Sequence, residues 1–245
     1  MNIKKNIPNL VTLMNLLSGT LAILFILRDE LILGSLFIAI ALMLDFLDGF
    51  LARLLHAQSP IGEQLDSLAD LVSFGVAPGF ILWSLMKVTD VQGETSYSDL
   101  LPFVAFLIPI FSAIRLARFT IDPSQQYTFH GLPTPASAIF IGALPMILTD
   151  EKTSSALQNI ISNPIVLLLM TIVISFLMVA PFNMLSLKFR DFSWKSNLLR
   201  YLFLIISIIL IIFLRFGAFP VIILGYVLLS VLVIPQRQQT KDETG

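Results

Sequence analysis

Apolar residues dominate this chain in long runs that polar residues interrupt only briefly. A membrane-spanning helix needs about 20 mostly apolar residues, and the apolar/polar alternation of membrane strands is absent. The runs cover residues 10–27, 31–55, 60–86, 100–119, 134–149, 164–182, 199–216 and 218–234. The pattern predicts an all-α polytopic membrane protein with about eight transmembrane helices, forming one domain over residues 1–245. The fifth run is short and contains Gly142 and Pro145, which favours a kinked or re-entrant helix.

Composition supports the same fold class. Of the 245 residues, 56% are hydrophobic and 13% are charged, whereas soluble domains carry about 25% charged residues. This scarcity of charge excludes an ordinary soluble enzyme, and the net charge of −1 gives no attraction to nucleic acid. With no cysteine, the chain has neither disulfides nor a zinc-thiolate site.

The lysines and arginines divide unequally between the two ends of the predicted spans. If the N-terminus is cytoplasmic, four of them face the opposite side: Arg28, Lys87, Lys152 and Arg215. Eleven face the cytoplasm: Lys4, Lys5, Arg53, Arg115, Arg118, Lys188, Arg190, Lys195, Arg200, Arg237 and Lys241. Because cytoplasmic loops are enriched in Lys and Arg, we expect both termini in the cytoplasm.

Four aspartates interrupt the second and third runs: Asp45, Asp48, Asp66 and Asp70. Each costs about 2.5–3.5 kcal/mol near the centre of a membrane helix on insertion scales. Arg53 can neutralise only one of them, and Glu63 adds another negative charge. The penalty for all four is on the order of 10 kcal/mol, so a bound cation is expected to complete the site.

The spacing of the aspartates predicts that they converge. At 100° per residue, Asp45 and Asp48 share one face of a helix, and Asp66 and Asp70 share one face of the next. Ser59-Pro60 is typical of an N-cap followed by a first helical residue. A short connection then makes the two helices an antiparallel hairpin with the carboxylates in two layers, about 10 and 15 Å from the turn.

Carboxylates without His or Cys select hard cations. Mg²⁺, Mn²⁺ or Ca²⁺ fits such oxygen ligands, and four carboxylates can hold two ions, as in phosphoryl displacement. Gly49 and Ala52 form a notch on the same face. The notch is explained either by close helix packing or by a flat ligand that approaches the backbone. Arg53 then pairs with a carboxylate or faces a phosphate.

This arrangement resembles a known family. The pattern Asp45-x2-Asp48-Gly49-x2-Ala52-Arg53-x8-Gly62-x3-Asp66-x3-Asp70 matches the signature of the CDP-alcohol phosphatidyltransferases at every position. The resemblance implies transfer of a phosphatidyl group from a CDP-linked lipid to an alcohol, with release of CMP. By position, Asp45, Asp48, Asp66 and Asp70 would bind Mg²⁺ or Mn²⁺, and Asp70 would also act as general base. Gly49, Ala52, Arg53 and Gly62 would form the CDP pocket.

Further stretches resemble the phosphatidylserine synthase branch of this family, over about residues 8–136. These are Pro8-Asn9-x2-Thr12-x2-Asn15 and residues 74–78, 114–119 and 129–136. The resemblance makes CDP-diacylglycerol and L-serine the expected substrates. Thr12 and Asn15 then join the CDP pocket, although interhelical hydrogen bonds explain them equally well. Arg115 and Arg118 bind the serine carboxylate, or simply extend toward the membrane interface.

Other functions remain open at this point. The same chemistry with glycerol 3-phosphate or an inositol derivative requires a more cationic acceptor pocket. A cation-coupled transporter also carries buried carboxylates, but in separated or repeated segments. The expected partners are the two substrates and membrane lipids, without nucleic acid, and the family resemblance implies a homodimer. The active site is expected on the cytoplasmic side of the membrane.

Overall fold

The computed structural model describes residues 3–89, 98–121, 130–184 and 194–233, and these are almost entirely helical. This confirms the all-α prediction. The α-helices are α1 (Ile3–Leu27), α2 (Leu31–Leu54), α3 (Pro60–Asp70), α4 (Ala77–Thr89), α5 (Leu107–Ile121), α6 (Thr134–Thr149), α7 (Ser155–Ile161), α8 (Pro164–Val179), α9 (Trp194–Leu214) and α10 (Ala218–Val233). A π-helix, η1 (Leu71–Val76), and two 3₁₀-helices, η3 (Ser98–Phe106) and η5 (Arg215–Gly217), connect some of them.

Five helical stretches in the described residues are long and apolar enough to cross a membrane. They are Asn6–Leu27, Leu31–Leu54, Pro60–Lys87, Leu100–Ile121 and Asn197–Leu232, and the pair α7 and α8, bent by 67°, adds a sixth if it is one span. The predicted count of about eight is therefore too high by this measure. The 16 residues of α6 extend only about 24 Å, less than the ~30 Å hydrocarbon core. The last two predicted spans are counted together as Asn197–Leu232, because only the short η5 separates α9 from α10.

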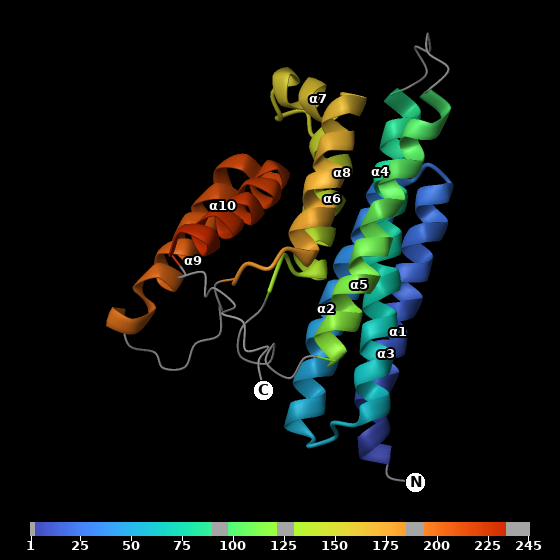
Figure 1. Cartoon of the computed structure of the whole chain (residues 1–245), viewed down its shortest axis with the longest axis vertical. Coiled ribbons are helices and arrows are strands. Elements are labelled where there is room, and N and C mark those ends of the chain that lie inside the picture. The colour runs from blue at the N-terminus through green and yellow to red at the C-terminus, as the bar shows by residue number, and fades with distance from the viewer. Residues whose placement is uncertain (1–2, 90–97, 122–129, 185–193, 234–245) are drawn as a thin grey trace, which may run out of the picture.

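That last stretch nevertheless reverses direction at its middle. Arg215 has a φ of 51° in the short η5 turn. The rings of Phe203 and Tyr226 lie 5.8 Å apart, although a straight helix would separate them by about 34 Å at 1.5 Å per residue. Helices α9 and α10 therefore fold back on each other, as the turn predicted near residue 215 requires, and lie side by side in Figure 1.

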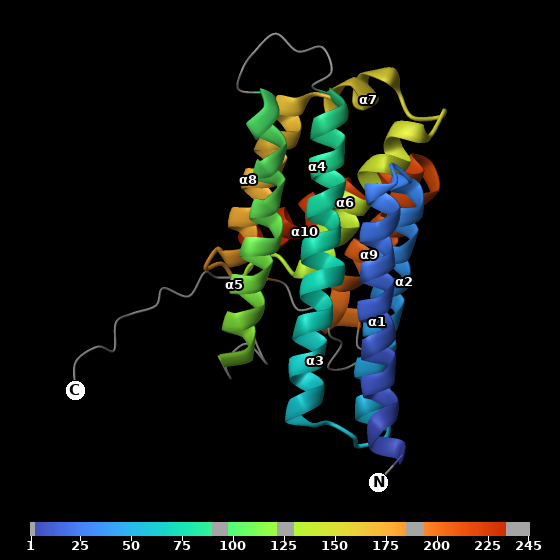
Figure 2. The same ribbon diagram turned by 90° about the vertical axis from the view of Figure 1, so that its right-hand side faces the viewer.

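The consecutive helices α3, η1 and α4 form the central column of the bundle. Figure 2 shows them between α1 and α2 on one side and α5 and α8 on the other. Their combined stretch, Pro60–Lys87, is the most buried of the five, with 61% of its apolar window inside the protein. The core surrounds α4 and α6 and includes the fully buried Phe74, Leu82 and Ile141. The column thus carries Asp66 and Asp70 into the interior.

A turn at Gly131 fixes the start of α6 against the end of α8. Gly131 has a φ of 68°, and a Cβ there would lie 2.5 Å from the carbonyl oxygen of Met178, so only glycine fits without strain. The backbone N–H of Gly131 donates to Phe182 O (3.0 Å), and that of Leu132 to Leu177 O (2.8 Å). These bonds connect the start of α6 to the end of α8, and α8 packs against α5.

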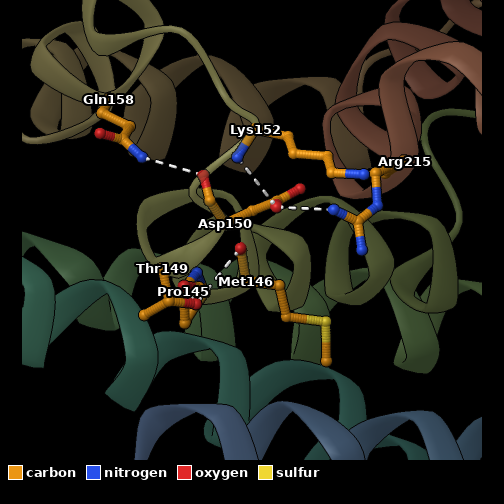
Figure 3. Close-up of polar contacts among 7 residues, drawn as sticks. All are labelled: Pro145, Met146, Thr149, Asp150, Lys152, Gln158 and Arg215. Carbon is orange, nitrogen blue, oxygen red and sulfur yellow. Dashed lines mark hydrogen bonds and ion pairs between the residues drawn. The ribbon is translucent and has the colours of Figure 1, made fainter.

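A second contact lies at the end of the bundle opposite the N-terminus. Figure 3 shows Asp150, just after α6, accepting a 2.8 Å hydrogen bond from Nη1 of Arg215 in the α9–α10 turn. The same carboxylate accepts from the backbone N–H of Lys152 at 3.2 Å, and the Gln158 amide donates to the Asp150 carbonyl at 3.2 Å. The C-terminal hairpin is thereby attached to the α6–α7 connection.

Candidate metal and nucleotide site

The connection between α2 and α3 brings the two acidic segments to the same end of the bundle. Helix α2 ends at Leu54, and His56 follows with a φ of 49°. Ser59 Oγ accepts a 3.1 Å hydrogen bond from the backbone N–H of Gly62, and Pro60 is the first helical residue. The predicted N-cap is therefore confirmed.

In the predicted antiparallel hairpin of these two helices, a third helix lies against both members. Helices α2 and α3 make little direct contact, and α1 packs against both of them. Figure 2 shows α1 beside α2, with α3 in the neighbouring column. The physical reason is the mixed surface of α1, on which Thr12, Asn15 and Ser18 are buried. A third helix thus contributes a wall to the site.

Three of the four predicted aspartates form one cluster. One carboxylate oxygen from each of Asp45, Asp48 and Asp66 lies within 4.8 Å of the other two. Asp48 is only 5% exposed. Asp48 Oδ2 and Asp66 Oδ1 are buried and have no hydrogen-bond partner among the described residues. Such oxygens are costly unless another ligand satisfies them.

The donor set fits a divalent cation. Opposite ligands of one ion are separated by twice the metal–oxygen distance, about 4.2 Å for Mg²⁺ and about 4.6–5.2 Å for Ca²⁺. The 4.8 Å limit on the oxygen separations in the cluster lies within the Ca²⁺ interval and is about 0.6 Å above the Mg²⁺ value. All three ligands are hard carboxylate oxygens, which excludes a soft-metal preference. Asp45, Asp48 and Asp66 can therefore hold a divalent metal ion.

Asp70 lies one helical turn beyond Asp66 and is 8% exposed. It interacts electrostatically with the other three aspartates. Its Oδ1 accepts a 3.4 Å hydrogen bond from Nδ2 of Asn15 on α1. Asn15 itself is fully buried. The sequence pattern predicts Asn15 in the nucleotide pocket, whereas in the structure its amide donates to Asp70.

A cavity of about 510 Å³ opens beside the cluster. It is formed by the start of α1, the end of α2 and the first turns of α3. Every predicted CDP-pocket residue except Asn15 lines it. The lining residues are Pro8, Asn9, Thr12, Asp48, Gly49, Ala52, Arg53, Ala57, Gln58, Ser59, Gly62, Glu63, Asp66 and Phe119. The cavity therefore joins the predicted pocket to two of the metal-site carboxylates.

Two glycines shape the cavity wall in different ways. A Cβ on Gly49 would meet only Arg53 Nη2, at 4.0 Å, so this position faces open space. A Cβ on Gly62 would lie 3.0 Å from Asn9 Oδ1 and 3.1 Å from Ser59 Oγ, so Gly62 permits close packing. Arg53 Nε donates to the Gly49 carbonyl at 2.9 Å, which holds the guanidinium at the cavity.

The two arginines of α5 have different surroundings. Arg115 is 9% exposed, its Nε has no partner among the described residues, and it interacts electrostatically with Asp70 and Tyr226. Arg118 is exposed, and its Nη1 donates to the Val179 carbonyl at 3.4 Å. Only Arg115 is therefore directed toward the acidic interior.

Two features of the site are absent from the sequence prediction. Asn9 lines the cavity and lies close to Gly62. Asn9 belongs to the Pro8-Asn9-x2-Thr12 pattern, which could have indicated its place in the pocket, but only Thr12 and Asn15 of this stretch are predicted pocket residues. A π-helix begins directly after Asp70. It cannot be recognised from the sequence, because the residues that form it belong to a continuous apolar run. π-Helical turns are frequent at functional sites.

The chain is similar to known proteins. A family model described as CDP-alcohol phosphatidyltransferase matches residues 5–177. A protein of Bacillus subtilis named CDP-diacylglycerol–serine O-phosphatidyltransferase is 36% identical over 190 residues, which cover 76% of this chain and 90% of that protein. Proteins of the same name from Helicobacter pylori and Mycobacterium leprae are 35% and 39% identical over 147 and 150 residues. These matches cover 59% and 58% of this chain, and 58% and 47% of the two relatives.

Proposed function

Because the chain belongs to the CDP-alcohol phosphatidyltransferase family, we propose that it transfers the phosphatidyl group of CDP-diacylglycerol to the hydroxyl of L-serine and releases CMP. The observation that carries this proposal is the cluster of Asp45, Asp48 and Asp66 at the wall of a 510 Å³ cavity. The names of the relatives supply the serine acceptor.

The cavity residues bind the nucleotide end of the donor. Gly49 leaves room for a flat group near the backbone of α2, and Thr12 and Gly62 line the opposite wall. Arg53 offers its guanidinium to a phosphate, an interaction that charge assistance strengthens. The small side chain of Ala52 takes up little of the cavity between Gly49 and Arg53. These roles agree with the position of each residue in the family signature.

Asp45, Asp48 and Asp66 hold divalent metal, Mg²⁺ or Mn²⁺, with Asp70 as a further ligand for a second ion. Metal held by these residues would neutralise the diphosphate and stabilise the charge on departing CMP. Asp70 accepts the proton of the acceptor hydroxyl as its oxygen attacks the lipid-bearing phosphorus. The new P–O bond forms while the bond to CMP breaks, and CMP leaves with the electron pair.

Arg115 binds the carboxylate of serine. It is buried and interacts electrostatically with Asp70, and its Nε has no hydrogen-bond partner among the described residues, so a charge-assisted hydrogen bond would satisfy it. One buried arginine suits one carboxylate. Glycerol 3-phosphate or inositol phosphate carries more negative charge and would require further cations. Arg118 belongs to this pocket only if it gives up its bond to Val179.

The site lies at the cytoplasmic face of the membrane. The N-terminus, the α2–α3 turn and the end of α5 share one end of the bundle (Figure 1). Arg53, Arg115 and Arg118 lie at this end, whereas Lys152 and Arg215 meet Asp150 at the other. The 11-to-4 distribution of cations supports this orientation. Of the eleven, Lys188, Arg190, Arg237 and Lys241 lie outside the described residues.

A direct assay tests the proposal. The purified chain is given CDP-diacylglycerol and Mn²⁺ or Mg²⁺, with labelled serine, glycerol 3-phosphate or inositol 1-phosphate in separate reactions. We expect lipid product from serine alone, and no product with excess chelator. Product from another acceptor would change the substrate and keep the chemistry. Absence of metal-dependent CMP release with every acceptor would overturn the proposal.

A further inference from the structure

Asn15 contacts Asp70 from a helix that lies outside the α2–α3 segment. Its Nδ2 donates to Asp70 Oδ1 at 3.4 Å across 55 sequence positions. Asn15 is fully buried and does not line the cavity, whereas Thr12, one turn earlier on α1, does. Among the described residues, the Asn15 amide nitrogen donates to the Asp70 carboxylate, and the amide oxygen is buried without a hydrogen-bond partner.

The contact depends on how closely α1 approaches the π-helix. Ser73, three residues after Asp70, donates from Oγ to the backbone carbonyl of Asn15 at 3.1 Å. Gly19 lies one turn further along α1, and a Cβ there would be 2.2 Å from Ser73 Oγ and 2.7 Å from Ser73 Cα. Only glycine allows this approach. Ser73 and Gly19 thus fix the position of Asn15 relative to Asp70 along α1.

The bond from Asn15 affects the orientation of Asp70 because the neighbouring charged groups include other carboxylates. Three other carboxylates interact with it, and a rotatable carboxylate among them has no fixed orientation of its own. A neutral amide that donates to Oδ1 fixes the side chain without adding charge. Oδ1 is then held by the amide, and Oδ2 lies outside this bond.

We propose that Asn15 is a positioning residue that orients the Asp70 carboxylate for proton transfer, held in place by the contact of Ser73 and Gly19 between α1 and η1. The inference rests on the proposed role of Asp70 as general base. It separates Asn15 from the nucleotide pocket to which the family pattern assigned it.

The test compares Asn15→Leu, which keeps the approximate volume and removes the donor, with Asn15→Gln, which keeps an amide. A misplaced reacting group costs about 10²-fold in rate for an error of about 1 Å. We expect N15L to lower kcat by about that factor with little change in the KM for CDP-diacylglycerol and in Mn²⁺-dependent CMP binding. N15Q should recover part of kcat. A raised KM or weakened CMP binding with normal kcat would place Asn15 in the nucleotide pocket and overturn the proposal.

A double-mutant cycle separates this inference from the proposed function. If Asn15 acts through Asp70, N15L should produce no further loss in a D70N background, because residues in direct contact are not additive. Near-normal turnover of D70N would remove Asp70 from the base role, whatever N15L does. An inactive D70N together with a fully active N15L would contradict only the positioning role.

If N15L does not fold, variants at the contact between α1 and η1 still test the positioning role of Asn15. S73A removes one hydroxyl and should lower kcat several-fold without changing the KM for either substrate. G19A should lower kcat further, because its Cβ forces α1 away from Ser73. The matched control is G142A in α6, where a Cβ meets nothing within 4 Å and kcat should stay unchanged. Normal kcat in both S73A and G19A would overturn the proposal.

Discussion

Arg118 is bonded through Nη1 to the backbone carbonyl of Val179, the last residue of α8. The final carbonyls of a helix lack intrahelical partners and carry the negative end of its dipole. The guanidinium therefore connects the end of α5 to the end of α8. Arg115, one turn earlier, is buried and directed toward Asp70. Two arginines that the sequence treats alike thus have different neighbours.

Substitution should separate the two arginines. We expect R115A to raise the KM for serine by tenfold or more, about 1.4 kcal/mol, because the carboxylate loses its buried partner. R115K should recover this only in part, since lysine lacks the planar fork. R118A should lower the thermal unfolding midpoint and change the serine KM much less. The KM for CDP-diacylglycerol serves as the internal control, and equal serine effects in R115A and R118A would contradict the distinction.

The acidic cluster should make stability depend on metal in an unusual way. Without metal, Asp45, Asp48 and Asp66 repel one another at short range, so D48N should unfold at a higher temperature than the wild type in chelator. With metal at 100 times its Kd, the wild type gains about 2.7 kcal/mol, which is about 5–11 °C for a chain of this size. D48N should lose most of this gain.

Thermal unfolding in detergent, with chelator and with Mg²⁺ or Mn²⁺, measures both effects. The control is D150N, which removes a carboxylate at the opposite end of the bundle and should keep the metal response. A wild-type midpoint that metal does not raise, or a D48N midpoint that metal raises equally, would show that the cluster does not hold the ion.

Gly49 provides a test of the cavity that does not disturb the fold. Because a Cβ at this position faces open space, G49L should leave the unfolding midpoint near the wild-type value while its side chain fills part of the cavity. We expect the KM for CDP-diacylglycerol to rise by more than tenfold, with a smaller rise for G49A. G142A supplies the control for adding a methyl group to a helical glycine. Reduced stability without any change in KM would place the nucleotide elsewhere.

The local features of the site were predictable because they depend on neighbours in sequence. Ser59 and Pro60 mark the start of α3 by their own chemistry, and the spacing of Asp45, Asp48 and Asp66 fixes their helix faces. The position of Asn15 was not predictable in this way. Its contact with Asp70 depends on α1 packing against both segments that carry the aspartates, and the buried polar side chains of α1 do not reveal in the sequence which helix they contact.

The number of membrane spans was also only partly predictable from the sequence. Apolar length alone counted 134–149 as a span, although α6 is too short to cross the hydrocarbon core unaided. The π-helix after Asp70 was also invisible, because one extra residue in a turn does not change an apolar run. The turn at Arg215 was predictable, since Arg and Gly interrupt two apolar runs there.

Two opposing contributions to stability meet at Arg215, the backbone strain of its positive φ and the ion pair of its side chain. Its φ of 51° places a non-glycine residue in the left-handed region, which costs about 1–2 kcal/mol. Its ion pair with Asp150 involves a side chain that is 48% exposed, and such pairs contribute about 0–1 kcal/mol. R215A loses the pair and keeps the strain, whereas R215G loses the pair and relieves the strain.

We therefore expect R215A to unfold at a lower temperature than the wild type and R215G to unfold at the same or a higher temperature. Added salt should lower the midpoint of the wild type slightly and leave both variants unaffected, because salt screens the exposed pair. Turnover should stay unchanged in both, since neither Arg215 nor Asp150 belongs to the cavity lining or to the aspartate cluster. If R215G were less stable than R215A, the ion pair and backbone flexibility would outweigh strain at this turn.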